Sequence, residues 1–341
     1  MKRLSLSLAA ALVLALAACG GDDEGGAADT TTAAEETIRV GLITDAGQLN
    51  DRGFNQLAFQ GVQRAKQELG VEVRVVESRS AAEYVPNMTT LARQGYDLII
   101  GVGFAQGDAV DRAATAFPDT KFVIVDVDQS TLPHKPENVV GMLFREEQVG
   151  YLAGYLAGLQ LRREDGPRVV GSVGGFKEPP VDRFIAGYQA GVAAAAPATE
   201  TLNGYSQDWD DQAKCKELAL NQIQAGAQIV FQVAGGCGLG ALDAARERDV
   251  WGIGVDADQA FLGPHVLTSA LKKVDEGVFR VVRSVVDGTW QGGRNLTFGL
   301  AEEGVGLGTI SREVPGEDRR QLERIAEEIA AGNIDVPREL G

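Results

Sequence analysis

The stretch Ile38-Arg39-Val40-Gly41-Leu42-Ile43 opens the part of the chain that can fold, and it decides the fold class. It is a short apolar run of the kind that forms a buried strand. A polar turn follows, and apolar residues then recur at the spacing of one helical face. These residues are Phe54, Leu57, Ala58, Gly61, Val62, Ala65 and Leu69. A strand that leads into a helix in this way is half of a βαβ unit, so the stretch predicts an α/β fold.

The turn between this strand and this helix holds the first candidate ligand-binding residues. In an open α/β sheet, the carboxyl ends of the strands face the ligand crevice. Asp45, Phe54 and Asn55 would therefore offer a ligand a carboxylate, an aromatic face and an amide. Packing of Phe54 in the core is the alternative for that ring. Asn50 and Asp51 stand directly before the helix, and we interpret them as caps of its first turn.

Short apolar runs alternate with amphipathic segments along the rest of the chain, which predicts two series of βα units. In the first series, further strands are expected at 71–76, 98–102, 122–126 and 139–143. In the second series, strands are expected at 168–173, 199–205, 229–234 and 251–255, and helices at 149–161, 181–195, 212–225 and 239–246. A strand at 266–271 would cross back toward the first series, and a last helix is expected at 319–330. The pattern predicts two doubly wound α/β lobes.

The first 36 residues are predicted to lie outside this fold. Residues 1–18 have the form of a secretory signal, with the basic pair Lys2-Arg3 ahead of an apolar segment. The segment ends in Leu-Ala-Ala-Cys, which resembles a bacterial lipobox and implies cleavage before Cys19 and acylation of its thiol. An ordinary signal peptide with an unrelated cysteine is the alternative. Residues 19–36 are mainly Gly, Ala, Thr and acid, which predicts a disordered tether.

Composition excludes several classes of function. The formal net charge is −16, and an exported acidic protein is a poor candidate for binding nucleic acid. The two histidines, His134 and His265, stand beside prolines in predicted loops, so no metal cluster or catalytic triad is evident. We interpret both as surface residues. Cys215 and Cys237 could form a disulfide in an exported protein, or remain two free thiols.

Polar and aromatic side chains follow the predicted strands of both lobes. Asp45, Asp126 and Asp256 each lie at or just past the end of a predicted strand, and Phe176 and Trp209 follow two others. Because such positions converge on the crevice, these residues would suit a neutral ligand with a flat face and several donor groups. A turn or helix cap is the alternative for any one aspartate. For each aromatic residue, packing and ligand contact remain open.

Four motifs resemble those of the basic membrane protein family, the lipoprotein receptors of ABC importers related to the purine nucleoside receptor A of spirochaetes. The motifs are Asp45-x-Gly47-x-x-Asn50-Asp51-x-x-Phe54-Asn55, Gly174-Gly175-x-x-x-Pro179-x-Val181-x-x-Phe184-x-x-Gly187, Ala234-Gly235-Gly236-x-Gly238-x-Gly240, and Gly254-Val255-Asp256-x-Asp258-Gln259 with Leu267-Thr268-Ser269-x-x-Lys272. Together with the lipobox, the resemblance covers essentially the whole chain.

The resemblance implies a type I periplasmic binding protein fold, in which two lobes joined by three crossovers close on a ligand. One lobe would comprise residues 37–144 plus 270–298, and the other residues 145–269 plus 299–341. The crossovers are expected near 143–147, 265–271 and 296–304. The lobes would form a monomer held at the extracytoplasmic face of the cell membrane by the lipid anchor.

The resemblance also implies roles for individual residues. Asp45, Asn55 and Asp126 would bond the edge of a purine base, and Phe54 would stack on it. Asp256 and Lys272 would hold the ribose hydroxyls. Either Trp209 or Phe176 would be the second stacking partner. The ligand would be a nucleoside of the adenosine, guanosine or inosine class, delivered to ABC permease subunits without a cofactor or catalytic step.

Two other functions compete with transport. Gly236-x-Gly238-x-x-Ala241 follows a strand, and Asp256 lies 20 residues after Gly236, which matches the dinucleotide fingerprint of an oxidoreductase. However, this turn lies in the second lobe and not in the first βα turn, and the chain is exported away from cytoplasmic cofactors. A surface sensor or adhesion lipoprotein on the same fold is the other alternative.

Overall fold

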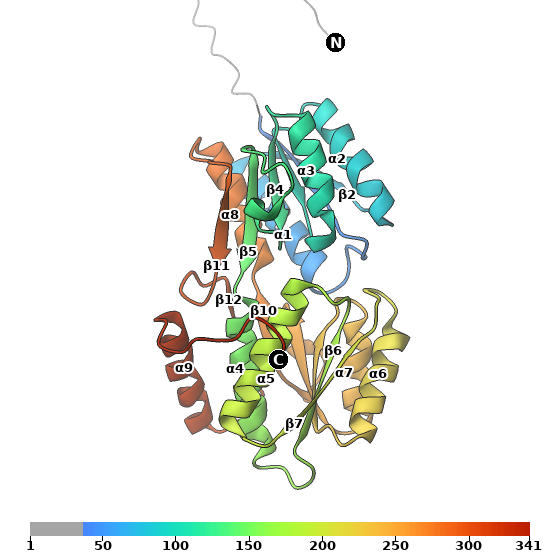
Figure 1. The fold of residues 1–341 in the computed structure, drawn as a ribbon, viewed down its shortest axis with the longest axis vertical. Coiled ribbons are helices and arrows are strands. Elements are labelled where there is room, and N and C mark those ends of the chain that lie inside the picture. The colour runs from blue at the N-terminus through green and yellow to red at the C-terminus, as the bar shows by residue number, and fades with distance from the viewer. Residues whose placement is uncertain (1–36) are drawn as a thin grey trace, which may run out of the picture. The chain divides into compact units, whose positions relative to one another are not determined.

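The computed structural model describes residues 37–341, which form two α/β lobes joined by three crossings of the chain (Figure 1). Each lobe is built on a six-stranded sheet. The predicted fold class, two doubly wound lobes, is therefore confirmed. The predicted signal at 1–18, the tether at 19–36 and the lipidation site Cys19 lie outside the described residues.

The first lobe contains an all-parallel sheet with the strand order β11-β5-β4-β3-β1-β2. Its strands are β1 (Arg39–Ile43), β2 (Glu72–Val76), β3 (Leu98–Gly101), β4 (Lys121–Val125), β5 (Val139–Phe144) and β11 (Arg294–Phe298). Helices α1 (Phe54–Leu69) and α8 (Val274–Val286) cover one face, and α2 (Tyr84–Arg93) and α3 (Gly107–Ala116) cover the other. Because both faces are covered, the central strands are continuous apolar runs in the sequence.

The second lobe has the strand order β12-β10-β9-β8-β6-β7, in which only the short edge strand β12 is antiparallel. Its strands are β6 (Val169–Gly174), β7 (Glu200–Tyr205), β8 (Ile229–Val233), β9 (Trp251–Asp256), β10 (Val266–Lys272) and β12 (Val305–Leu307). Its helices are α4 (Glu146–Leu161), α5 (Pro179–Ala195), α6 (Gln212–Gln224), α7 (Gly238–Glu247) and α9 (Gly316–Ala330). The 3₁₀ helices of the described residues are Ala81–Glu83, Phe104–Gln106, Gln129–Thr131 and Ala260–Leu262.

The chain crosses between the lobes after β5, after β10 and after β11. The expectation that the strand at 266–271 itself crosses back, with the first lobe resuming at residue 270, is wrong in detail. Ala270, Leu271 and Lys272 pair with β12 on one side and, for Ala270 and Leu271, with β9 on the other. Because these pairings hold the strand in the second sheet through its last residue, the crossing follows Lys272.

Helices α4 and α5 pack with their backbones in close contact. A Cβ atom added at Gly154 would lie 1.9 Å from the carbonyl oxygen of Tyr188, and one added at Gly187 would lie 2.1 Å from that of Glu147. Only glycine allows this approach without a shift of the backbone. The contact fixes the start of α4 against α5, beside the junction of the lobes.

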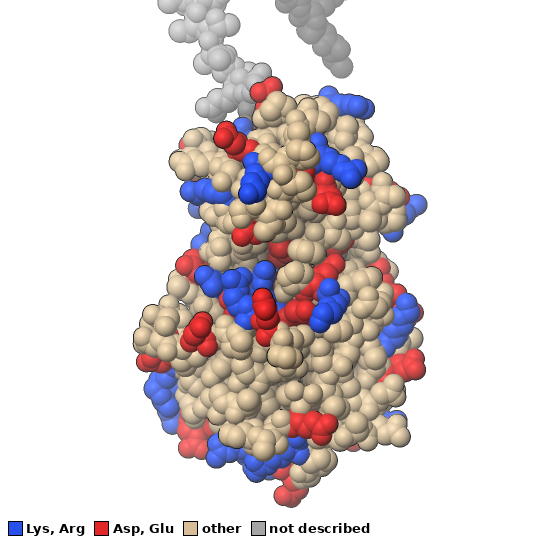
Figure 2. Space-filling model, viewed as in Figure 1, with Lys and Arg blue, Asp and Glu red and all other residues tan. Residues whose placement is uncertain are grey.

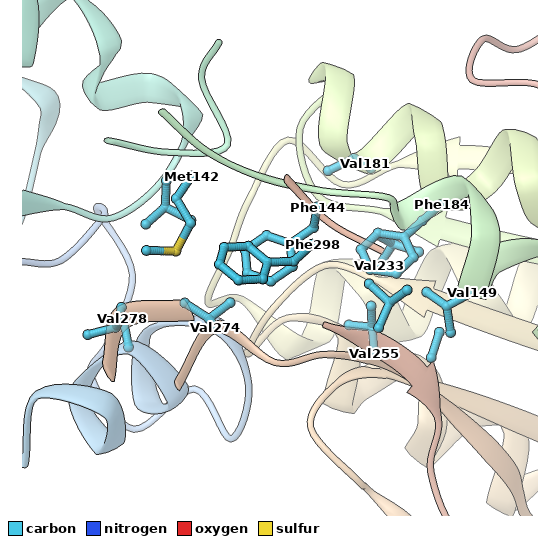
Figure 3. Close-up of a cluster of buried hydrophobic side chains, with 14 of the residues drawn as sticks. Met142, Phe144, Val149, Val181, Phe184, Val233, Val255, Val274, Val278 and Phe298 are labelled. Atoms are coloured by element: carbon cyan, nitrogen blue, oxygen red, sulfur yellow. The ribbon is translucent and has the colours of Figure 1, made fainter. Parts of the chain in front are cut away.

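The hydrophobic core continues from one lobe into the other through this junction (Figure 3). The rings of Phe144 at the end of β5 and Phe298 at the end of β11 stack with their centroids 5.4 Å apart. They lie between Met142 and Val278 of the first lobe and Phe184 of the second (Figure 3). Two of the three crossings therefore leave the first lobe from one apolar cluster.

Candidate ligand-binding site

The two lobes enclose a cleft of about 640 Å³, including the part open to solvent. Seven of the eight residues proposed from the sequence line it, and only Phe176 does not. The seven are Asp45, Phe54, Asn55, Asp126, Trp209, Asp256 and Lys272. The lining also includes residues that sequence reasoning did not select, among them Glu178, Phe184, Phe104 and Asp210.

Asp45 enters the cleft from the end of β1 and is buried. Its Oδ1 atom accepts hydrogen bonds from the Tyr84 hydroxyl and, at 2.7 Å, from the backbone N–H of Ala46. The side-chain oxygen of Asn55 accepts from the Asp45 backbone N–H at 3.2 Å. Burial raises the pKa of the Asp45 carboxyl, and the bonds from Tyr84 and Ala46 partly oppose the increase. Its Oδ2 atom has no hydrogen-bond donor among the described residues and remains available to a ligand.

Asp51 caps α1, as expected from the sequence. Its carboxylate accepts hydrogen bonds from the backbone N–H groups of Gly53 and Asn55 at 2.9 and 2.8 Å, and from Gln56 at 3.2 Å. Asn50 is exposed, and its side chain makes no capping bond within the described chain. The Asp51 cap holds the first turn of α1, with Phe54, at the cleft.

Lys272 is the buried cation of the site, with 2 % of its side chain exposed. Its Nζ atom lies 2.6 Å from Asp126 Oδ1 and 2.9 Å from Glu146 Oε1. The same nitrogen lies 5.0 Å from the centre of the Phe54 ring and 5.2 Å from that of Phe144. Burial alone would lower the pKa of Lys272, but the neighbouring carboxylates reverse the effect and raise it. Because Asp126 follows β4 while Lys272 ends β10, this ion pair joins the two lobes.

Asp126 and Asp256 occupy equivalent places in the two lobes, directly at the ends of β4 and β9. Both have left-handed backbone conformations, with φ values of 72° and 62°. Such conformations cost of order 1–3 kcal/mol for a residue other than glycine, and they cluster at functional sites. The strain turns each carboxylate into the cleft.

Asp256 is buried and makes no side-chain hydrogen bond within the described residues. It faces the other lobe, because a Cβ atom added at Gly53 would lie 3.5 Å from its Oδ2 atom. Burial raises the pKa of Asp256 to about 7, Lys272 opposes this increase, and Asp51 and Asp126 add to it. The pKa of Asp126 rises to about 6, chiefly through burial, although Lys272 lowers it. The site therefore holds more carboxylates than its one buried cation can pair.

Trp209 is an aromatic residue that the second lobe presents to the cleft, as is Phe184. Its ring lies against Gly175, where an added Cβ atom would come within 2.1 Å of it. Phe176 packs on the Trp209 ring, with centroids 5.4 Å apart and planes at 50°. The structure thus places Phe176 beside Trp209 and outside the lining of the cleft.

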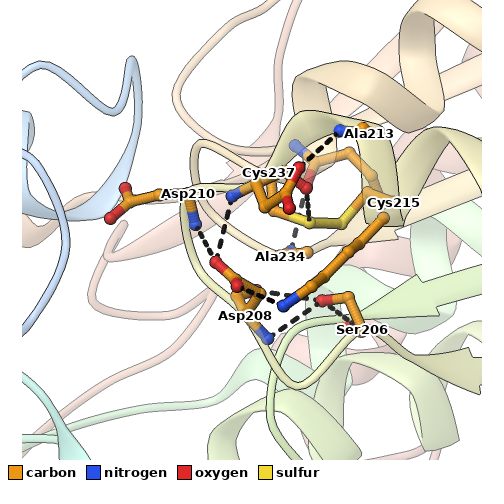
Figure 4. Close-up of a disulfide and its surroundings, with 11 residues drawn as sticks. Ser206, Asp208, Asp210, Ala213, Cys215, Ala234 and Cys237 are labelled. Atoms are coloured by element: carbon orange, nitrogen blue, oxygen red, sulfur yellow. Dashed lines mark hydrogen bonds and ion pairs between the residues drawn. A yellow bond between two sulfur atoms is a disulfide. The ribbon is translucent and has the colours of Figure 1, made fainter.

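A disulfide between Cys215 and Cys237 fixes the loop that carries Trp209 (Figure 4). The two Cα atoms are 5.6 Å apart, and the bond joins α6 to the turn before α7. The backbone N–H of Cys237 donates to the carbonyl oxygen of Trp209 at 2.8 Å. Of the two states that the sequence left open, the structure has the disulfide.

The lobes also touch across the mouth of the cleft. The backbone N–H of Gln48 donates to Asp210 Oδ1 at 3.3 Å, and Gln259 Nε2 donates to the carbonyl oxygen of Arg52 at 3.4 Å. Figure 2 shows acidic and basic side chains gathered on the surface where the lobes meet. At the first crossing, Arg145 pairs with Glu147 at 3.5 Å.

The two histidines lie apart from the cleft. His134 is exposed and contacts Asp111 at 2.6 Å. His265 is only partly exposed, so its interpretation as a surface residue is wrong: it packs beside Gly252 and Gly263. Across residues 37–341, no group of three or more His, Cys, Asp or Glu side chains is arranged to hold a metal ion. Within the same residues, no helix combines the length and apolar character needed to cross a membrane.

Two doubly wound lobes that are joined by three crossings and enclose a polar and aromatic cleft define a type I periplasmic binding protein. The chain belongs to the family of PnrA-like ABC transporter substrate-binding proteins, whose model matches residues 38–339. The description of this family is that of substrate-binding proteins of ABC transporters.

Individual relatives agree with this assignment. The chain is 32 % identical to a CD4+ T-cell-stimulating antigen of Listeria monocytogenes, with 99 % of each chain covered. It is 32 % identical to the ABC transporter nucleoside-binding protein BmpA of Lactococcus lactis, with 88 % of this chain and 89 % of the relative covered. A solute-binding protein of an ABC transporter system from Aeropyrum pernix has a structure that superposes with a TM-score of 0.80 at 27 % identity, covering 89 % of this chain and 94 % of the other.

The raised pKa of Asp256 predicts a pH-dependent cost to the fold. The pKa of the Asp256 carboxyl is ordinarily 3.8 and rises to about 7 in the folded protein. Protonation of this carboxyl therefore contributes its full free energy to the fold below pH 3.8, and this contribution is lost as the pH rises through about 7. Asp256→Asn should therefore stabilise the ligand-free protein more at about pH 8 than at about pH 5, by on the order of 2 kcal/mol. Urea denaturation at both pH values measures this difference.

The exposed Asp119, changed to asparagine, is the matched control and should show no such pH dependence. An equal effect of Asp256→Asn at both pH values would contradict the assignment of the raised pKa.

Proposed function

We propose that the protein is the extracytoplasmic solute-binding lipoprotein of an ABC importer and carries a purine nucleoside. The observation that carries the proposal is the composition of the cleft. It holds an aromatic ring from each lobe, Phe54 and Trp209, together with buried carboxylate oxygens that accept no hydrogen bond from the described residues, namely Oδ2 of Asp45 and both oxygens of Asp256. A flat base between aromatic rings and a sugar with several hydroxyl donors would satisfy both features.

We assign the base to the end of the cleft that holds Asp45 and Asn55. Phe54 would stack on one face of the base and Trp209 on the other, and Asp126 would complete the polar edge. The name of the Lactococcus lactis relative, a nucleoside-binding protein, supports the choice of ligand class.

We assign the ribose to Asp256 and Lys272. Asp256 has no protein partner among the described residues, so it is available to accept from a ribose hydroxyl. The Lys272 ammonium donates a hydrogen bond to Asp126 Oδ2 at 2.7 Å and forms an ion pair with Glu146 Oε1 at 2.9 Å. Because an ammonium has three N–H donors, Lys272 would also donate to a ribose oxygen.

The two lobes contribute different parts of this site. Asp45, Phe54 and Asp126 come from the first lobe, whereas Trp209, Asp256 and Lys272 come from the second. A ligand that touches both sets binds the closed arrangement better than an open one, and it shifts the protein toward closure. The closed protein would then deliver the nucleoside to the permease subunits.

Calorimetry and thermal unfolding with adenosine, guanosine, inosine, the free bases and free ribose test this function. At least one nucleoside should bind tightly, and at 100 times its Kd it should stabilise the fold by about 2.7 kcal/mol. Asp256→Asn should weaken nucleoside binding at least about tenfold, since a hydrogen bond to a charged group is worth roughly 1.5–3 kcal/mol. Asp119→Asn should leave binding unchanged.

A response to a free sugar but to none of the three nucleosides would contradict the proposal. So would nucleoside affinity that is unchanged in Asp256→Asn, or a free base that binds as tightly as its nucleoside.

We also propose that acylation of Cys19 holds the mature protein at the cell membrane. The basis is the Leu-Ala-Ala-Cys sequence that ends the signal segment. Cys19→Ser should release the protein from the detergent phase of a cell extract or leave the precursor unprocessed. A variant that is processed and stays in the detergent phase would show that the anchor lies elsewhere.

A further inference from the structure

Glu178 is an acidic residue that lines the cleft and has no role in the proposed contacts with the base and the ribose. It stands directly before α5, at the turn after β6, where its backbone N–H donates to the carbonyl oxygen of Phe176 at 3.0 Å. Its carbonyl oxygen in turn accepts from the backbone N–H of Asp182 at 2.9 Å. These two hydrogen bonds fix the backbone of Glu178 at its N–H and at its carbonyl oxygen, and Glu178 lines the cleft.

The Glu178 carboxylate has no protein partner. Within residues 37–341 it forms neither an ion pair nor a side-chain hydrogen bond, although it is partly buried. The adjacent cation, Lys177, is directed elsewhere, 3.5 Å from Asp182 and over the ring of Tyr205. Burial raises the pKa of Glu178 to about 7, and repulsion from Asp45 and then Asp126 adds to the increase. A carboxylate that is partly desolvated and unpaired is an acceptor in need of a donor.

Glu178 and Asp45 face the same part of the cleft from opposite lobes. Asp45 follows β1 of the first lobe, Glu178 directly precedes α5 of the second, and both residues line the cleft. The Oδ1 atom of Asp45 is already occupied by Tyr84 and Ala46, which leaves Oδ2 as its free acceptor. Closure of the lobes therefore brings two acceptors together, and this is favourable only if the ligand places donors between them.

We propose that Glu178 and Asp45 together select a ligand edge with two adjacent donor groups, so that the receptor prefers guanosine to inosine and adenosine. This inference rests on the proposed nucleoside function. Guanine presents a ring N–H beside an exocyclic amino group, so it supplies one donor to each carboxylate. Hypoxanthine has the ring N–H without the amino group, and adenine has an amino group beside a ring nitrogen that accepts.

The preference for guanosine follows because only guanine supplies a hydrogen-bond donor to both carboxylates. With inosine or adenosine, one carboxylate would stay desolvated and unpaired, and a site built for a donor discriminates strongly against a ligand that lacks it. Lys272 forms its ion pairs with Asp126 and Glu146 and none with Glu178, so its charge offsets only part of the repulsion there.

Calorimetric titration of the full mature chain with guanosine, inosine and adenosine at about pH 8 tests the proposal. Wild-type protein should bind guanosine about tenfold or more tightly than inosine. Glu178→Gln should weaken guanosine binding by about the same factor and leave inosine binding within about twofold. Glu200→Gln, at an exposed position that starts β7, is the matched control and should keep the wild-type ratio.

The possible failures can be told apart. If none of the three nucleosides binds, the proposed function is wrong and this inference falls with it. If nucleosides bind without a guanosine preference, or if Glu178→Gln weakens all three equally, the function stands and the role of Glu178 is overturned. The wild-type ratio decides the matter even if the variant fails to fold.

Discussion

One buried ammonium group, that of Lys272, joins the two lobes and organises the site between them. It lies within 3 Å of carboxylates from the first lobe and from the start of α4, and aromatic rings surround it. Removing one partner of such a buried pair typically costs 3–5 kcal/mol, because the remaining charge is left uncompensated. The pair therefore constrains where β4, β10 and α4 can lie. The first crossing leads into α4, and the second follows β10.

The same site contains more negative charge than Lys272 can balance. Asp45, Asp256 and Glu178 each keep an acceptor without a protein donor, and burial raises the pKa of all three. This arrangement is unfavourable for the ligand-free protein but suits a ligand rich in N–H and O–H donors. The left-handed backbone at Asp126 and Asp256 is a second local cost at the same place. In our account, ligand binding offsets both costs only when the lobes are closed.

Much of the fold and part of the site follow from sequence pattern. The βα alternation predicts both lobes, and strand ends identify Asp45, Asp126 and Asp256, because the carboxyl ends of parallel strands meet at one edge. Glu146 and Glu178 were missed because acidic residues at helix starts ordinarily need no ligand to explain them. The choice between Trp209 and Phe176 depended on a tertiary contact with Gly175. The end of β10 depended on pairing with β12, which is distant in sequence.

We propose that both lobes hold the ligand and that the ligand favours their closure. Small-angle X-ray scattering, with and without saturating guanosine, tests it most directly. We predict that the radius of gyration of the wild-type protein falls when the nucleoside binds. An unchanged radius of gyration in the wild-type protein, with calorimetry showing the site filled, would contradict the account.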